Sequence, residues 1–206
     1  MENYKIVRVD LDSVKKIIEN SPDGTHTNFL KAAHSLWFRF KNYEKNAPFA
    51  LVIDSEIKSL IFSTFNRDGY ANLYEIVTVE GQGGHGYGET LWREWIKIAT
   101  DSGCHRLKIS CTPESVMWHH SHGLIFWGVD KSGSLRSDQE LFPTVEKQLD
   151  YRQEVLQNPK NHFPPKSQID KFKKEIQNLE FGSHKKMKIQ KAISCIGNAW
   201  LAGYLY

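Results

Sequence analysis

The residues with the clearest chemical potential form a glycine cluster directly after a run of β-branched residues. The cluster places five glycines within eight positions: Gly81, Gly83, Gly84, Gly86 and Gly88. Glycine permits positive φ and lets bare backbone N–H groups approach a ligand. The preceding run 76–79 favours a strand, and apolar residues recur at helical spacing from Leu91 onward. Unpaired N–H groups at the start of a helix, aided by its dipole, predict an anion site with phosphate as its natural occupant.

Two other interpretations of the cluster stay open at this point. The first is a flexible turn without a ligand, because a glycine cluster alone is weak evidence for binding. The second is a dinucleotide fingerprint, since residues 81–86 match the pattern G-x-G-x-x-G. That fingerprint requires an acidic residue about 20 positions later, at the end of the next strand. The next strand, 104–112, ends without Asp or Glu, which argues against a Rossmann site.

Other titratable residues lie on both sides of the glycine cluster. Glu75 precedes it on the same predicted strand, and a carboxylate near a cleft can serve as a general base. Glu80 is the second choice for that role. Three histidines gather further along, at positions 119, 120 and 122, but neighbours on a helix face different ways. Without a carboxylate or thiolate at matching spacing, they predict no metal site.

The elements that must position these residues follow from periodicity. Alternating or β-branched runs predict strands at 5–11, 49–54, 57–65, 70–79, 107–111, 124–129 and 135–141. Helical spacing predicts helices near 14–18, from a cap at Thr27 or Asn28, after the glycine cluster, from 112 and over 145–156. Short links among the strands between 49 and 79 make these strands antiparallel. We therefore expect a mixed α/β protein with a mostly antiparallel sheet.

Two segments resemble motifs of the GNAT superfamily of acyl-CoA N-acyltransferases. Residues 83–88 with Leu91 are similar to the family's pyrophosphate loop, Arg/Gln-x-x-Gly-x-Gly/Ala, with Gly83 at the position of the leading Arg or Gln. Residues 115–124 are similar to the family's Ala-x-x-Phe-Tyr-x-x-x-Gly-Phe segment and also follow a predicted strand. His119 takes the place of the Tyr that protonates the departing thiolate in many members.

The resemblance implies a GNAT-like central sheet flanked by helices, and acetyl-CoA as cosubstrate without a metal. The acyl group would pass to an amine by direct attack in a ternary complex, with His119 as general acid. Counting back from the loop, the family's commonest glutamate position falls on Asn72, so Glu75 is expected to be the base because of its place on the central strand. Backbone amides near the bulged central strand would hold the pantetheine, and the glycine loop would hold the diphosphate. The predicted cofactor-binding residues are Val77, Thr78, Val79, Gln82, Gly83, Gly84, His85, Gly86, Tyr87, Gly88 and Thr112.

Composition and charge indicate how the chain is divided into domains. We expect a GNAT-like domain over residues 1–143 and a helical basic extension, 144–206, packed on it. Residues 159–191 hold nine lysines against three acidic residues, although the net charge of the 206 residues is only +3. Three cysteines without metal-type spacing favour reduced thiols, and no run of 18 apolar residues occurs. The expectation is a cytoplasmic protein that does not enter a membrane.

Two alternative functions remain open from the sequence. A degenerate family member could bind acyl-CoA without turning it over, or the segment 159–191 could bind nucleic acid through counterion release. The acceptor amine could belong to a small molecule, a protein or a nucleobase. Acyl-chain length and oligomeric state are not determined by these patterns.

Overall fold

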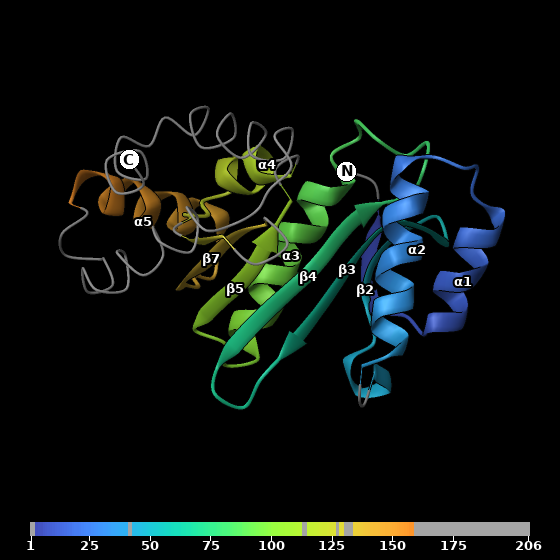
Figure 1. Cartoon of the computed structure of the whole chain (residues 1–206), viewed down its shortest axis with the longest axis horizontal. Coiled ribbons are helices and arrows are strands. Elements are labelled where there is room, and N and C mark those ends of the chain that lie inside the picture. Colours follow the sequence, from blue (N-terminus) through green and yellow to red (C-terminus); the bar gives the residue numbers. More distant parts are fainter. Residues whose placement is uncertain (1–2, 41–42, 113–114, 127, 130–133, 159–206) are drawn as a thin grey trace. The chain divides into compact units, whose positions relative to one another are not determined.

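The computed structural model describes residues 3–40, 43–112, 115–126, 128–129 and 134–158. Figure 1 shows the elements in chain order. The chain divides after His105 into two compact units, which are described in turn. The predicted basic segment 159–191 and the rest of the extension beyond residue 158 lie outside the described residues.

The first unit contains four antiparallel strands in the order β1-β2-β3-β4. These strands are β1 (Tyr4–Arg8), β2 (Phe49–Ile53), β3 (Glu56–Phe65) and β4 (Tyr70–Thr78). The helices are α1 (Leu11–Asn20), α2 (Thr25–Phe38) and α3 (Tyr87–Asp101), with a short 3₁₀ helix, η1 (Tyr43–Asn46). The predicted meander of strands between residues 49 and 79 is confirmed.

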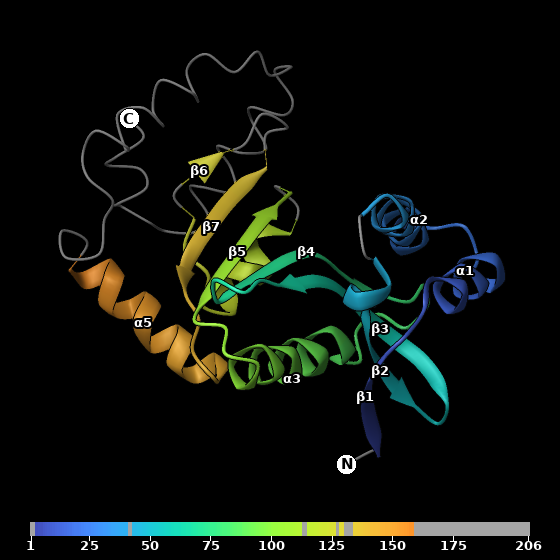
Figure 2. The ribbon, with the colours of Figure 1, turned by 90° about the horizontal axis from the view of Figure 1, so that it is seen from below.

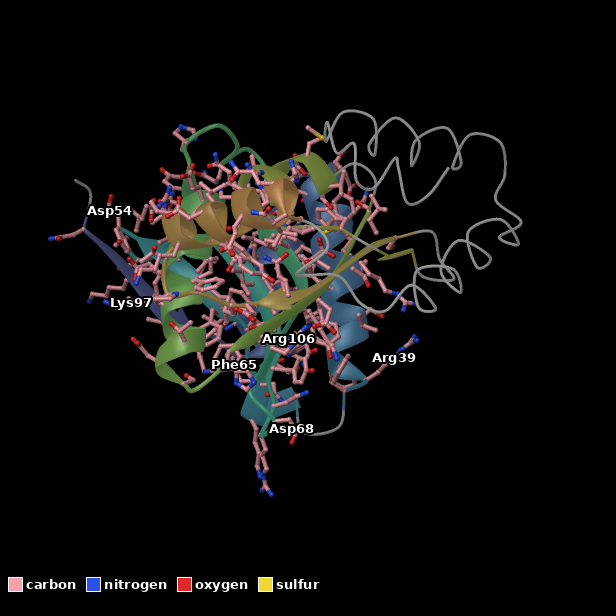
Figure 3. All side chains as sticks on the ribbon, turned by 90° about the vertical axis from the view of Figure 1, so that its left-hand side faces the viewer. Arg39, Asp54, Phe65, Asp68, Lys97 and Arg106 are labelled. Carbon is pink, nitrogen blue, oxygen red and sulfur yellow. The ribbon has the colours of Figure 1, made fainter. Side chains whose placement is uncertain are left out.

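The turns at the two ends of β3 explain why its neighbours are antiparallel. Asp54 and Ser55 both have positive φ, 50° and 66°, which matches the twist of a two-residue hairpin turn. At the other end Gly69, with φ of 76°, donates its N–H to the Asn66 carbonyl. Asp54 and Asp68 mark these two turns in Figure 3.

Helices cover both faces of the sheet in the first unit. α1 and α2 lie on one face and α3 lies on the other, as Figure 2 shows. The core under α1 and α2 is made of buried apolar side chains, among them Leu11, Val14, Leu30, Trp37, Leu60, Phe62 and Val77. On the other face, Trp92 and Trp95 of α3 stack with ring centroids 5.3 Å apart, and Trp95 Nε1 donates to Ser63 Oγ at 2.8 Å. Burial on both faces fixes the direction of each β4 side chain.

The start of α2 differs from the predicted cap at Thr27 or Asn28. The N-cap is Gly24, which has no side chain to accept a hydrogen bond. The missing acceptor comes from the segment after β4, because Glu80 Oε2 accepts the Thr27 N–H at 3.1 Å. A residue distant in sequence supplies the cap, so local sequence rules could not find it.

The second unit holds β5 (Arg106–Cys111), β6 (Gly128–Val129), β7 (Leu135–Glu140), α4 (Val116–Ser121) and α5 (Val145–Gln157). β7 pairs antiparallel with both β5 and β6. The predicted strand over 124–129 is wrong for residues 124–126, because other groups take their backbone hydrogen bonds. Leu124 N–H donates to the His119 carbonyl, and Ile125 N–H donates to Gln139 Oε1 at 2.7 Å.

The predicted helix 145–156 is confirmed as α5 and packs within the second unit. Thr144 caps it, since its hydroxyl accepts the Lys147 N–H at 3.3 Å. Fully buried Gln148 donates to the Glu140 carbonyl at 3.0 Å and accepts the Phe142 N–H at 3.2 Å. Within the described part of the chain, no helix has the length and apolar character to cross a membrane.

Candidate functional site

The glycine loop, residues 81–88, leaves β4 and enters α3 at an exposed edge of the first unit. Gly81, Gly84 and Gly86 have φ values of 78°, 81° and 75°, a region that residues with a Cβ rarely adopt. A Cβ at any of these three positions would meet no atom within 4 Å. Residues 81 and 83–86 are exposed, and no side chain of the described residues covers the three glycines.

The backbone amides of this loop are available to a ligand. Gln82 N–H donates to the Val79 carbonyl, and Thr90 N–H donates to the Gly86 carbonyl as the first bond of α3. Between them, the amides of residues 83–88 have no backbone acceptor among the described residues. The first N–H groups of a helix carry partial positive charge, and they bind anions without any charged side chain.

Gly88 lies close to the end of β4. A Cβ at Gly88 would lie 3.4 Å from Thr78 Oγ1, so the helix start approaches the strand end closely. The helix N-terminus is thereby held beside the last residues of β4. The φ of Gly88 is not positive, and a Cβ would make an ordinary van der Waals contact there, so the structure does not require glycine at this position.

The strand amides predicted to hold pantetheine divide between the two edges of β4. Val79 N–H donates to the Lys58 carbonyl of β3 at 2.9 Å, so it is not available to a ligand. Because successive amides of a strand point to opposite edges, Val77 N–H also faces β3 and Thr78 N–H faces away from it. Of the three predicted residues, Thr78 has the amide that suits the role.

β4 carries the bulge that the resemblance implies. Phe62 pairs with Glu75 and Ser63 pairs with Leu73, which leaves Tyr74 as an extra residue in β4. A bulge bends a strand and redirects the side chains beside it. Here it places Tyr74 against the core under α1 and α2.

Glu75 lies next to this bulge and shares the α1/α2 face. It pairs with Phe62 and stands two residues before Val77, and both of these belong to the core under α1 and α2. Burial raises the pKa of the Glu75 carboxyl to about 7. No hydrogen bond or ion pair joins the carboxyl to another described residue. A carboxyl with this pKa can exchange a proton near neutral pH.

Glu80, the second choice for a base, has a different role in the structure. Its carboxylate lies over Gly24, where a Cβ would come within 2.2 Å of Oε2, and it accepts the Thr27 N–H. These contacts make Glu80 a helix cap. Asn72 lies three residues before Glu75 in β4. Its side chain donates to Thr64 Oγ1 at 3.4 Å and has no titratable group.

The environment of His119 argues against the predicted general-acid role. Its side chain is only 4% exposed and meets Trp118 edge-to-face with ring centroids 4.9 Å apart. Burial, with a smaller contribution from His122, lowers the pKa of His119 to about 3. At neutral pH the imidazole is therefore neutral and does not carry the proton that an acid must supply. Its burial and its contact with Trp118 favour a packing role in the second unit, so the general-acid role stays a prediction that the proposed function does not use.

The neighbouring histidines are also engaged within the second unit. His122 stacks on Trp118 with centroids 4.1 Å apart, and His122 Nδ1 lies 2.7 Å from the Trp118 carbonyl. Arg152 of α5 donates to the His120 carbonyl. No group of three or more His, Cys, Asp or Glu side chains that could hold a metal ion occurs in the described parts of the chain.

The predicted site residues thus fall into two sets. The glycine loop, the end of β4 and Glu75 all belong to the first unit. Thr112 and His119 belong to the second unit, where Thr112 follows β5 and its carbonyl accepts the Ser115 N–H at 3.0 Å. The roles of both sets as binding and catalytic residues remain predictions.

Comparisons with known proteins bear on the fold. No protein-family model and no curated protein matches the sequence. The PaiA N-acetyltransferase from Thermoplasma acidophilum, solved in complex with coenzyme A, is 12% identical with a TM-score of 0.51, over 67% of this chain and 99% of that one. A GNAT-family protein from Desulfovibrio desulfuricans is 14% identical with a TM-score of 0.53, over 68% and 100%. A bacterial toxin is 10% identical with a TM-score of 0.50, over 77% and 97%.

These similarities establish the class of fold. The chain has the mixed α/β fold of the GNAT N-acetyltransferases, as the sequence resemblance predicted. At 12–14% identity the likeness concerns the path of the backbone. It does not determine the substrate or the mechanism.

Proposed function

We propose that this protein transfers an acyl group, acetyl in the simplest case, from CoA to an amine. The observation that carries the proposal is the exposed row of amides at residues 83–88, at the start of α3 and beside the bulged strand β4. The solved proteins of the same fold include one that was crystallised with coenzyme A. The open loop, its unpaired amides and the dipole of α3 suit a diphosphate.

The residues of the first unit have separate tasks in this proposal. Amides of the glycine loop bind the diphosphate, and the Thr78 amide, directed away from β3, binds the pantetheine. When bound, the cosubstrate would supply a thioester, whose acyl carbon would form a C–N bond to the amine as its C–S bond breaks. CoA would leave as a thiolate, which takes a proton from water. Holding both reactants in one orientation removes much of the entropic part of the barrier.

Glu75 is the proposed general base. An amine is protonated in neutral water, so it must lose a proton before its nitrogen can attack. The Glu75 carboxyl, with its pKa raised to about 7, accepts that proton directly or through water. A carboxylate with an ordinary pKa would be a weaker base, so burial beneath the aromatic core is what fits Glu75 to the task.

Isothermal titration with CoA and a thiol-release assay with acetyl-CoA test the proposal together. We expect saturable CoA binding and, with a panel of primary amines, release of free thiol that depends on the amine. CoA binding without thiol release for any amine would make the protein a non-catalytic acyl-CoA binder. No CoA binding at millimolar concentration would overturn the proposed function.

A further inference from the structure

His26 lies beside the glycine loop, although no sequence motif indicates this. It stands in the first turn of α2, 57 residues before Gly83. A Cβ built on Gly83 would lie 3.8 Å from His26 Cε1, so the imidazole ring is next to the loop backbone. The ring is next to the part of the loop that carries the amides of residues 83 and 84. These amides have no backbone acceptor among the described residues.

The contact with Glu80 holds the first turn of α2 in this place. Glu80 precedes the glycine loop, and its carboxylate accepts the N–H of Thr27, the residue after His26. Thr27 is itself buried, and its hydroxyl donates to the Pro22 carbonyl at 2.8 Å. These two hydrogen bonds of Thr27 therefore hold the backbone next to His26 in place beside the loop. Figure 1 shows the start of α2 and the loop at the same end of the first unit.

One ring nitrogen of His26 is left unsatisfied. Its Nδ1 is buried and has no hydrogen-bond partner within the described ranges of the chain. Buried polar atoms are nearly always paired, so an unpaired one requires an explanation. A neutral imidazole has one donor and one acceptor nitrogen, so at least one ring N–H is present in either tautomer.

We propose that His26 is a further binding residue for the CoA diphosphate, donating a ring N–H to a phosphate oxygen beside the loop amides. This inference rests on the proposed function, because it assigns the ligand of the same loop. The Glu80 carboxylate would repel a phosphate, but it is occupied by the N-terminus of α2 over Gly24. Because Nδ1 is buried, the ring N–H that meets the phosphate is the one on Nε2, which is not buried and has no hydrogen-bond partner among the described residues. The nearby carboxylate is turned to the helix.

Binding of CoA to His26 variants tests the assignment. His26→Ala should weaken CoA affinity about tenfold, as expected for the loss of a hydrogen bond to a charged group. His26→Gln, which keeps an N–H donor, should recover part of that affinity. The matched control is His105→Ala, because His105 also packs on a glycine, Gly69, at the opposite end of β4, and CoA affinity should not change.

Imidazole NMR of the wild-type protein gives a second readout that does not depend on a variant folding. The His26 ring signals, assigned with His26→Gln, should shift when CoA is added and stay in place when pantetheine, which lacks the diphosphate, is added. Wild-type CoA affinity in His26→Ala, or ring signals that ignore CoA, would overturn the role of His26 alone. Failure of the wild-type protein to bind CoA would instead overturn the proposed function.

Discussion

Glu75 pairs directly with Phe62 across the β3–β4 ladder, so a carboxyl group stands on the same sheet face as an aromatic core. Phe62 in turn meets Trp37 of α2 edge-to-face, with ring centroids 5.6 Å apart. These neighbours exclude water from one side of the carboxyl without offering it a hydrogen bond. The raised pKa of Glu75 follows from this arrangement, and two predictions depend on it.

The first prediction concerns the rate of acyl transfer. Because only the ionised Glu75 can accept a proton, the rate at saturating amine should rise with pH and reach half its maximum near pH 7. Glu75→Gln should lower kcat by about 10² to 10⁴ with little change in CoA affinity. Measuring kcat from pH 5 to 9 checks both points. A wild-type rate in the Gln variant would remove Glu75 from the mechanism.

The second prediction concerns folding stability. The pKa of Glu75 is about 7 in the folded protein against an ordinary 4.5, so the unfolded chain ionises first as pH rises. Stability contributed by the protonated carboxyl is complete below pH 4.5 and is lost as pH rises to about 7. Glu75→Gln does not titrate. Its unfolding free energy relative to wild type should therefore increase by about 3 kcal/mol between pH 4 and pH 8.

Urea denaturation of both proteins at the two pH values measures this difference. The comparison is internal, because any change in packing from the Gln side chain contributes equally at pH 4 and at pH 8. An unfolding free-energy difference that is the same at both pH values would show that the carboxyl is not held in the protonated form by burial.

The third prediction tests the long-range cap of α2. Glu80→Ala removes the acceptor for Thr27 N–H, and Gly24→Ala places a Cβ where the carboxylate lies. Each change should cost about 1 kcal/mol of unfolding free energy, the usual value of a helix N-cap. The double variant should lose no more than either single one, because both remove the same interaction.

Asp10→Ala provides a matched control for the cap. Asp10 caps α1 by accepting the Ser13 N–H at 2.6 Å, and it shares no partner with Glu80. Its loss should add to that of Glu80→Ala in the double variant. Additive losses for the Glu80 and Gly24 pair would contradict the shared cap.

The fourth prediction uses the conformation of the glycine loop. Gly84→Ala and Gly86→Ala should each destabilise the fold by about 1–2 kcal/mol, because both positions have positive φ. They should also weaken CoA binding, since a shift in φ misdirects the amides. Gly103→Ala is the control, because Gly103 has φ of 85°, open space around it and lies after α3. It should lose similar stability and keep CoA affinity; equal CoA affinity in all three variants would argue against a loop site.

The fifth prediction concerns the buried histidine of α4. His119 has a pKa of about 3 in the folded protein, well below its ordinary 6.5, so the unfolded chain binds a proton that the folded chain does not. Between pH 6.5 and about 3, stability should fall with falling pH, by up to about 1.4 kcal/mol per pH unit. His119→Gln should reduce this slope, as denaturation at pH 5 and 7 would show. An unchanged pH dependence of the unfolding free energy would show that a group other than His119 causes it.

Periodicity and turn chemistry were enough to predict the elements that carry the loop. The β-branched run of β4, the glycines and the apolar face of α3 gave the correct strand–loop–helix order, because each signal is local. The hairpin between β2 and β3 followed from the same kind of pattern. Resemblance to a known loop then supplied the proposed ligand class, acyl-CoA, which residue patterns alone left open.

The remaining features depended on contacts between distant residues. Glu80 reads as an ordinary loop carboxylate in the sequence, yet it caps α2 and helps to fix His26 beside Gly83. Gln139 takes the backbone N–H of Ile125, which shortens the expected strand. His119 was predicted to be an acid because the ordinary pKa of histidine is near neutral. Its burial within the second unit, which lowers that pKa, could not be inferred from residue spacing.

The proposed recognition through amides at residues 83–88 has a consequence for how such a sequence can change. An N–H group is common to every residue except proline, so a site built from main-chain donors constrains torsion angles far more than side-chain identity. The glycines at positive φ are then the costly positions to alter, and the intervening residues can vary with little penalty. A chain of this kind can diverge until sequence profiles no longer detect it, while its backbone still superposes on that of its structural relatives.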